Sequence, residues 1–147
     1  MERQDIVEKV RAFNRFYLPA LNLLGNHYLG SEFGVTYARI FYEIYCHEGC
    51  NAAYIAKSMN IDKGYVSRIL ASHEKHGFLI RVTSETDRRS QELYLTDEGK
   101  RRAEDFIVKS NQDIGGHLEG LSDRELQQLG EAVDTIVRLL KKGERAK

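Results

Sequence analysis

Cationic and hydrogen-bonding residues gather at two places in the middle of the chain. They are Lys63, Gly64, Tyr65, Ser67 and Arg68 in the stretch DKGYVSR, and Asp87, Arg88 and Arg89 in the stretch TSETDRRSQ. Guanidinium, ammonium and hydroxyl groups bind phosphate oxygens and base edges, and a glycine lets the backbone come near, so both stretches predict contact with a nucleic acid. The sequence shows no nucleophile–base–acid set and no glycine-rich phosphate loop, so we expect neither an enzyme nor a cofactor.

The stretch DKGYVSR opens a predicted helix that Asp62 caps and that ends at Gly77. A shorter helix is predicted just before it, from the N-cap residue Asn51 to about Asn60. Two short helices joined by a few residues favour a helix-turn-helix, whose second helix enters the major groove with its N-terminal turns. The alternative is that the polar residues form an ordinary solvated helix face.

The stretch TSETDRRSQ forms the tip of a predicted β-hairpin. Ile80 and Val82 alternate with polar residues before it, and Leu93 and Leu95 do so after it, which is the period of a strand pair with one buried face. On such a projecting loop an arginine can enter the narrow minor groove or bind phosphate. We expect Asp87 to stay close to an arginine and fix the shape of the loop. The alternative is a local turn held by a surface ion pair.

Longer helices are predicted on both sides of this central part. Apolar residues at helical spacing run from Ile6 to Leu24, and Pro19 predicts either a kink or a restart within that run. A second helix is expected from about Thr36 to Gly49. After a loop marked by glycines, this second helix leads into the predicted helix-turn-helix.

After the hairpin, Thr96 is expected to cap a helix that Gly115 and Gly116 weaken or end. The capping box at residues 122–125 starts the last helix, which Gly143 is expected to close. The order helix, helix, helix-turn-helix, hairpin, helix, helix predicts a mainly α fold with a small β-hairpin wing. This is a winged helix-turn-helix with long helices at both ends of the chain.

Charge and hydropathy bound the class of protein. The chain has 22 basic and 22 acidic residues, but residues 54–102 hold 10 basic and 7 acidic ones, so positive charge is concentrated in the middle third. The start MERQDIVEKV is too charged for a signal peptide, and no 18 consecutive apolar residues occur. We therefore expect a cytoplasmic protein with no membrane partner.

The run NAAYIAKSMNIDKGYVSRILASHEKHGFLIRVTSETDRRSQELYLTDEGK resembles the winged helix-turn-helix of MarR-type transcriptional regulators. The resemblance lies in the DKGYVSR helix start, the KHGFL exit, the DRR wing and the LTDEG junction, and extends over about residues 5–142. It implies that Asp87 shapes the wing and that Arg89 reaches the minor groove. Ser67 and Arg68 would lie on the major-groove face.

The same resemblance implies chains that dimerise through their terminal helices, bind palindromic DNA and often release it when a small molecule binds. Long apolar stripes in the terminal helices support a dimer, because a small winged domain cannot bury them all. The alternative is a monomer whose ends fold back on the core. We expect one domain over residues 1–147, with a DNA-binding lobe at 35–96 and dimerisation helices at 1–30 and 97–143.

The stretches VRAFNRFY, YLGSEFGVTYARIFYEI and IDKGYVSRIL are similar to the regulator half of proteins in which a MarR-type domain is fused to a GNAT acetyltransferase. We expect any acetyltransferase to be a separate partner chain. The patterns together predict a sequence-specific, DNA-binding transcriptional regulator, a ligand-responsive repressor that acts as a homodimer on a pseudo-palindromic operator. The alternative, which the neutral net charge leaves open, is a protein-interaction adaptor that keeps the fold without binding DNA.

Aromatic residues in the first two predicted helices could line a cavity for a small-molecule effector or simply form core. The candidates for an effector site are Phe13, Tyr17, Arg39 and Tyr42. In such a site, Arg39 or Arg15 would anchor an anionic ligand.

The cysteines and histidines present further alternatives. Cys46 and Cys50 would share one helix face, but no paired histidines complete a zinc site, so we expect no metal. Structural thiols are the expectation, and a redox role would require a lowered thiol pKa. His73 and His76 suit either helix-end electrostatics or a phosphate contact.

Overall fold

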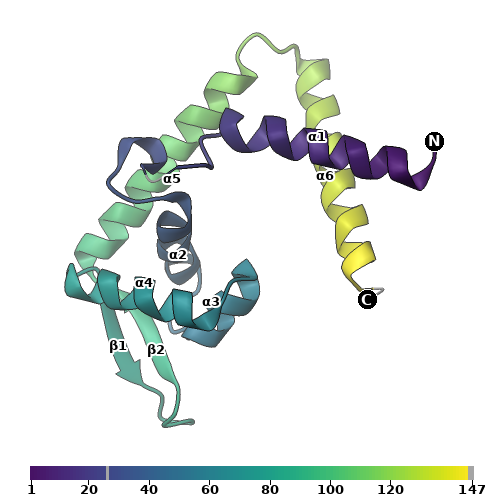
Figure 1. Cartoon of the computed structure of the whole chain (residues 1–147). Coiled ribbons are helices and arrows are strands. Elements are labelled where there is room, and N and C mark those ends of the chain that lie inside the picture. Colours follow the sequence, from purple (N-terminus) through teal and green to yellow (C-terminus); the bar gives the residue numbers. More distant parts are fainter. Residues whose placement is uncertain (26, 146–147) are drawn as a thin grey trace. The chain divides into compact units, whose positions relative to one another are not determined.

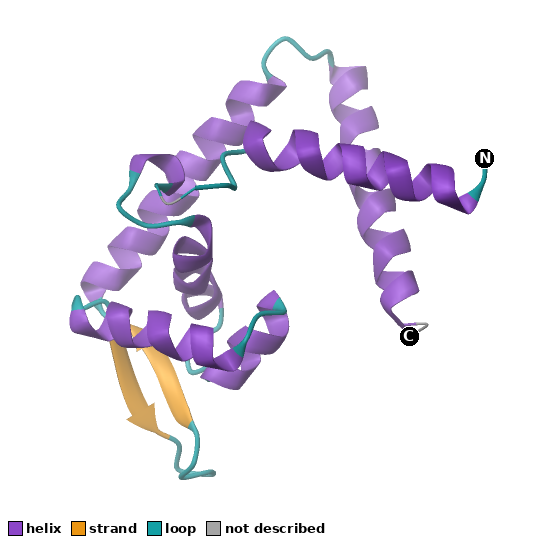
Figure 2. Ribbon diagram, viewed as in Figure 1, coloured by secondary structure: helices purple, strands orange, loops and turns teal. Residues whose placement is uncertain are grey.

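Local sequence signals account for most of the helices and strands of the computed structural model, which describes residues 1–25 and 27–145 (Figures 1 and 2). The elements are α1 (Arg3–Ala20), the 3-10 helix η1 (Tyr28–Gly30), α2 (Val35–Cys46), α3 (Ala52–Met59), α4 (Lys63–Lys75), β1 (Leu79–Thr83), β2 (Gln91–Leu95), α5 (Asp97–Leu118) and α6 (Asp123–Arg145). The predicted mainly α fold with a β-hairpin wing is confirmed. The chain divides into two compact units, residues 1–111 and 112–147, and each is described by itself.

The core of the first unit fixes which faces of α2, α3 and α4 point outward. Its fully buried aliphatic and aromatic side chains are Ile40, Phe41, Ile44, Ile55, Val66, Leu70 and Leu93. Each such side chain contributes roughly 1.5–3 kcal/mol of burial free energy, so the rotation of every helix about its axis is strongly determined. The predicted N-caps are confirmed. Asn51 Oδ1 accepts a hydrogen bond from the Tyr54 N–H at 2.8 Å, and Asp62 Oδ2 accepts one from the Tyr65 N–H at 3.1 Å.

The hairpin is antiparallel, with Leu79 opposite Leu95 and Arg81 opposite Leu93. Leu93 and Leu95 are buried as predicted. Ile80 and Val82 are 49% and 45% exposed, so their predicted place on the buried face is wrong. The period of two was right, but its phase in β1 was shifted by one residue.

The reason for that phase lies in Leu79 and Arg81. Leu79 is 4% exposed and takes an inner position beside Leu95. Arg81 follows on the same face, where its Nε lies 3.4 Å from the Glu74 carboxylate of α4. An ion pair with a neighbouring helix therefore lets a cation occupy a half-buried position that an apolar residue was expected to fill.

A short extended segment pairs with β2 on the side away from β1. The Gly49 N–H donates to the Leu93 carbonyl at 2.9 Å, and the Leu93 N–H donates to the Cys50 carbonyl at 2.8 Å. These bonds tie the connection between α2 and α3 to the base of the hairpin. The start of the helix-turn-helix and the wing therefore belong to one rigid framework.

The junction between β2 and α5 holds the end of α4. Thr96 Oγ1 accepts from the Gly99 N–H at 3.1 Å, as predicted for a cap, and donates to the Gly77 carbonyl at 2.6 Å. A Cβ added to Gly99 would lie 2.2 Å from the Phe78 carbonyl oxygen. Only glycine therefore lets the start of α5 cross the backbone after α4 this closely.

Several predicted helix ends are wrong. The helix that contains Pro19 neither kinks nor restarts but ends at Ala20, so Leu24 lies outside it. Helix α5 continues through Gly115 and Gly116 to Leu118, so of the two predicted effects of these glycines the ending of the helix is wrong, and α6 continues past Gly143 to Arg145. A glycine ends a helix where it takes a left-handed conformation, as Gly120 does with φ +83°, whereas a glycine with helical φ costs only about 1 kcal/mol relative to alanine.

The second unit begins with the predicted capping box. Ser122 Oγ accepts from the Glu125 N–H at 3.2 Å, and the Glu125 carboxylate accepts from the Ser122 N–H at 3.1 Å.

Among the described residues, none of the helices combines the length and the apolar character needed to cross a lipid bilayer.

Candidate nucleic-acid interface

The first turns of α4 present the polar residues of the DKGYVSR stretch to solvent. Lys63, Gly64, Tyr65, Ser67 and Arg68 are all exposed. They face outward because Val66, Ile69 and Leu70, on the opposite face of the helix, are buried in the core. A Cβ on Gly64 would lie 2.9 Å from Asp62 Oδ2, so glycine at this position leaves room for the capping carboxylate.

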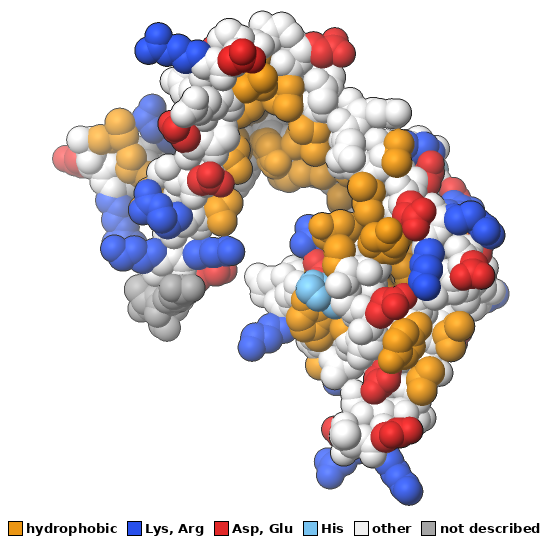
Figure 3. Space-filling view, turned by 180° about the vertical axis from the view of Figure 1, so that it is seen from behind, with side chains coloured by type: hydrophobic (Ala, Val, Ile, Leu, Met, Phe, Trp, Pro, Cys, Tyr) orange, Lys and Arg blue, Asp and Glu red, His pale blue; other side chains and the backbone are white. Residues whose placement is uncertain are grey.

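The wing loop projects from the end of the hairpin and carries exposed cations at its tip (Figure 3). Asp87 holds the loop through the backbone. Its Oδ1 accepts from the Arg89 N–H at 3.0 Å, while its own N–H donates to Ser84 Oγ at 3.3 Å. Asp87 was expected to stay close to an arginine, and the contact is with the backbone of Arg89. Within the described chain, neither Arg88 nor Arg89 forms an ion pair, so both guanidinium groups are available to a partner.

A groove of about 490 Å³ joins the wing to the starts of α3 and α4. It is lined by Asn51, Ala52, Ala53, Lys63, Arg81, Thr83, Asp87, Arg88, Arg89, Ser90, Gln91 and Leu93. Four of these residues are cationic and one is a carboxylate. The positive end of the α3 dipole adds to the same field. The groove is therefore suited to bind phosphate groups.

Some of the predicted DNA-binding residues line the groove, together with residues that were not predicted. Lys63 and the three wing residues line it, whereas Tyr65, Ser67 and Arg68 stand on the exposed face of α4 outside its lining. Arg81 and Asn51 were not predicted. Asn51 Nδ2 donates to Ser90 Oγ at 3.1 Å and so connects α3 to the wing. The correct phase of β1 would have revealed Arg81, but nothing local distinguishes Asn51 from an ordinary cap.

Residues 35–91, which contain the helix-turn-helix and most of the wing, match the family model described as the MarR family. This segment therefore resembles a MarR-family winged helix-turn-helix. The putative transcriptional regulatory protein for the hcr operon of Thauera aromatica is 29% identical over 97 residues, which are 64% of this chain and 52% of that protein. The organic hydroperoxide resistance transcriptional regulator of Bacillus subtilis is 30% identical over 97 residues, which are 64% of this chain and 63% of that protein. The chain thus spans about half to two thirds of the length of these relatives.

Solved structures show the same MarR-type fold over nearly the whole chain. FabT of Streptococcus pneumoniae in complex with DNA has a TM-score of 0.72 at 21% identity, covering 96% of this chain and 99% of that one. The MarR family transcription regulator SP03579 has a TM-score of 0.77 at 20% identity, covering 98% and 93%. At these identities the likeness concerns the fold.

One predicted role at the end of α4 is wrong. His73 is 0% exposed; its ring meets that of Tyr37 edge-on and stacks on that of Phe41, with centroid distances of 3.9 and 4.0 Å. Burial lowers the pKa of His73 to about 3, so the ring is neutral and cannot reach a phosphate. His76 is exposed, and its Nδ1 lies 2.7 Å from the Ser72 carbonyl, as expected for a histidine at a helix end.

The two thiols do not share a helix face, because α2 ends at Cys46. Cys46 is exposed, so the expectation of a structural thiol there is wrong, while Cys50 is half-buried. Burial, with Glu43 nearby, raises the pKa of Cys50 to about 11. A redox role needs the opposite shift, so Cys50 is a poor redox candidate.

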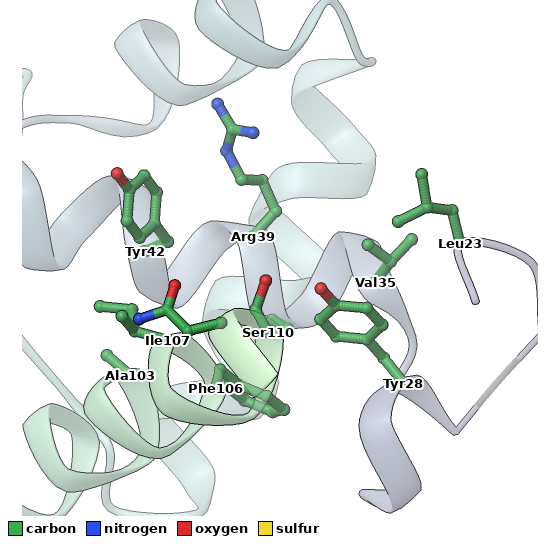
Figure 4. Close-up of a pocket in the computed structure, with 11 residues that line it drawn as sticks. Leu23, Tyr28, Val35, Arg39, Tyr42, Ala103, Phe106, Ile107 and Ser110 are labelled. Carbon is green, nitrogen blue, oxygen red and sulfur yellow. The ribbon is translucent and has the colours of Figure 1, made fainter. Parts of the chain in front are cut away.

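A second cavity, of about 440 Å³, lies between α2 and α5 (Figure 4). Its lining residues are Leu23, Tyr28, Val35, Ala38, Arg39, Tyr42, Ala103, Phe106, Ile107, Ser110 and Asn111. Arg39 and Tyr42 of the predicted effector site belong to it. Phe13 and Tyr17 do not, and stack on each other on exposed parts of α1 with ring centroids 5.1 Å apart. Because α1 ends at Ala20, the segment after it supplies the wall that α1 was expected to supply.

Proposed function

We propose that the protein is a transcriptional regulator that binds duplex DNA through α4 and the wing. The observation that carries the proposal is the cationic groove between the wing and the starts of α3 and α4, next to the exposed first turns of α4. A helix fits the major groove, and a basic loop beside it reaches the adjacent minor groove or backbone. The regulators named among the relatives support the same reading.

Each group has a distinct part in this proposal. Ser67 and Arg68 face the base edges of the major groove, and Lys63 binds phosphate at its rim. Arg88 and Arg89 bind the neighbouring minor groove and its phosphates, while Asp87 keeps the loop in shape. Arg81 also lines the groove, where its pairing with Glu74 offsets part of its positive charge.

The acting species in this proposal is a homodimer. Apolar side chains at helical spacing on α6 are 38–58% exposed, namely Leu126, Leu129, Val133, Ile136, Val137 and Leu140. A similar exposed stripe on α1 contains Ile6, Val7, Val10, Phe13 and Tyr17. Such stripes favour cover by a second copy. A two-fold dimer presents two copies of α4 to the half-sites of a pseudo-palindrome, about one helical turn apart.

The effect on transcription that we propose is repression relieved by a small molecule. A relative in Bacillus subtilis, 32% identical over 71 residues, is named HTH-type transcriptional repressor YetL. The cavity between α2 and α5 has mainly apolar walls with Arg39 at its edge, which suits an organic anion. Displacement of bound operator by such an anion, lost in an Ile107→Trp variant that fills the cavity, is the expected result.

Salt dependence tests DNA binding against the adaptor alternative. Binding of fluorescent genomic duplex fragments is measured by anisotropy from about 50 to about 200 mM salt. Because several phosphate contacts release counterions, we expect affinity to fall steeply, by about 10³-fold or more for six contacts. An acetyltransferase or other protein partner requires no such release. Flat or absent binding would favour the adaptor.

A further inference from the structure

We propose that Tyr65 is a positioning residue that orients Arg68 to read a guanine in each half-site. The proposal rests on the DNA-binding function proposed above. It concerns which base the protein prefers, whereas the cationic groove contributes to affinity for the phosphate backbone of the DNA.

The two side chains meet on the outer face of α4. They are three residues apart, and the Arg68 guanidinium carbon lies 5.7 Å from the centre of the Tyr65 ring. This distance is within the range of a cation–π interaction. The Tyr65 N–H is bonded to the capping carboxylate of Asp62 at 3.1 Å, so the backbone that carries the ring is fixed. Tyr65 is 41% exposed, which leaves the pair open to a partner.

Among the described arginines that lie over an aromatic ring, Arg68 differs in having no carboxylate partner. Arg39 lies over Tyr42 but pairs with Glu43, and Arg102 lies over Phe33 and Phe78 but pairs with Glu32. Within the described residues, no carboxylate pairs with Arg68. A ring face orients a guanidinium without neutralising it and without occupying the N–H groups in its plane. The structure thus holds Arg68 with its donors free.

An arginine held in this way is suited to guanine. Two N–H groups of one guanidinium match O6 and N7 of guanine in the major groove, and such a pair discriminates against other bases by roughly 5- to 150-fold. Without the ring, the flexible arginine has more conformational freedom to lose on binding, and it can contact phosphates instead. Loss of Tyr65 should therefore reduce base discrimination more than overall affinity.

The test uses the full-length protein and an operator duplex obtained by selection from random sequence. In turn, each G·C pair of both half-sites is replaced by A·T, and the dissociation constants are measured for the wild type, Tyr65→Ala, Tyr65→Phe, Arg68→Ala and the double alanine variant. We expect one position per half-site where the wild type discriminates at least about 5-fold. Discrimination there should fall to about 2-fold or less in Tyr65→Ala and persist in Tyr65→Phe, which keeps the ring.

The double variant separates positioning from direct contact. If Tyr65 acts through Arg68, Tyr65→Ala changes nothing further at that position once Arg68 is alanine. A further loss there, or full discrimination in Tyr65→Ala, would overturn the proposal. Thermal unfolding of each variant shows that the exposed substitutions leave the fold intact. Failure of the wild type to bind any duplex would instead overturn the proposed function, and this inference with it.

Discussion

Arg39 and Glu43 form an ion pair in which the carboxylate is buried and the guanidinium stands at the wall of the cavity between α2 and α5. Arg39 Nη2 lies 2.8 Å from Glu43 Oε1, and the two side chains are 53% and 5% exposed. The Ser58 hydroxyl of α3 donates to Glu43 Oε2 at 3.4 Å. The pair therefore connects the edge of the cavity to the helix-turn-helix.

Arg39→Ala should destabilise the protein, because it leaves the buried carboxylate with Ser58 as its remaining described hydrogen-bond partner. We expect a loss of about 1–3 kcal/mol in the free energy of unfolding, less than for a fully buried pair because Arg39 is half exposed. Lys109→Ala is the control, since it removes a pair of the same spacing with both partners exposed, and should cost at most about 0.5 kcal/mol. Urea unfolding at one fixed protein concentration measures both, and equal losses would contradict the role of burial.

His73 should make stability depend on pH. Its pKa is about 3 in the folded protein and about 6.5 when exposed, so between these values the unfolded chain binds the extra proton. Stability is therefore greatest above pH 6.5 and falls as the pH drops through that window, with this residue contributing a loss of about 2 kcal/mol between pH 7 and pH 5. His73→Leu removes this contribution. Comparable pH slopes for wild type and variant, in unfolding titrations, would show that the ring is not buried and neutral.

Arg89→Ala should weaken DNA binding on every sequence tested. One cationic contact is lost from each subunit, two per bound dimer, so fewer counterions are released, and the slope of log affinity against log salt becomes shallower by about two. Lys109→Ala again serves as the control, because it removes one positive charge away from the groove. A variant that binds like the wild type, with the same slope, would show that the wing does not touch DNA.

The proposed role of Asp87 in DNA binding depends on the shape of the wing loop and not on the charge of the carboxylate. Asp87→Asn keeps an acceptor for the Arg89 N–H and removes a negative charge, so DNA affinity should stay equal or rise. Asp87→Ala removes the same charge and also the acceptor, so affinity should fall despite the favourable change in charge. If both variants bind more tightly than the wild type, the carboxylate has no part in shaping the loop.

The thiols should react at different rates. Cys46 is exposed, whereas Cys50 is half-buried with its pKa raised to about 11 by burial. At pH 8 a disulfide reagent should label one thiol quickly and the other slowly. Cys46→Ser should abolish the fast phase and Cys50→Ser should leave it. A fast phase that survives in Cys46→Ser would contradict this assignment.

The sequence predicted features that depend on neighbouring residues. The caps at Asn51, Asp62 and Thr96 were correct because a cap is decided within a few residues of the chain. The alternation in β2 and the order of elements followed for the same reason. The exposed face of α4 followed from the spacing of its apolar residues.

Features decided by distant contacts could not be predicted in this way. The phase of β1 depends on the pairing of Arg81 with Glu74, and the buried position of His73 depends on two rings from α2. Which residues line the groove likewise depends on how α3 packs against the wing, so the sequence identified Asn51 only as a helix cap. The wall of the second cavity shifted because α1 ends at Ala20.

The central claim is that α4 and the wing recognise duplex DNA as parts of a dimer. Selection of random-sequence duplexes by the purified protein at about physiological salt, followed by sequencing, tests it most directly. We predict enrichment of an inverted repeat whose half-sites lie about 10 base pairs apart, centre to centre, and its loss in the Arg68→Ala, Arg89→Ala double variant. Enrichment of no sequence at any salt concentration, or enrichment of the same repeat by the double variant, would contradict the claim.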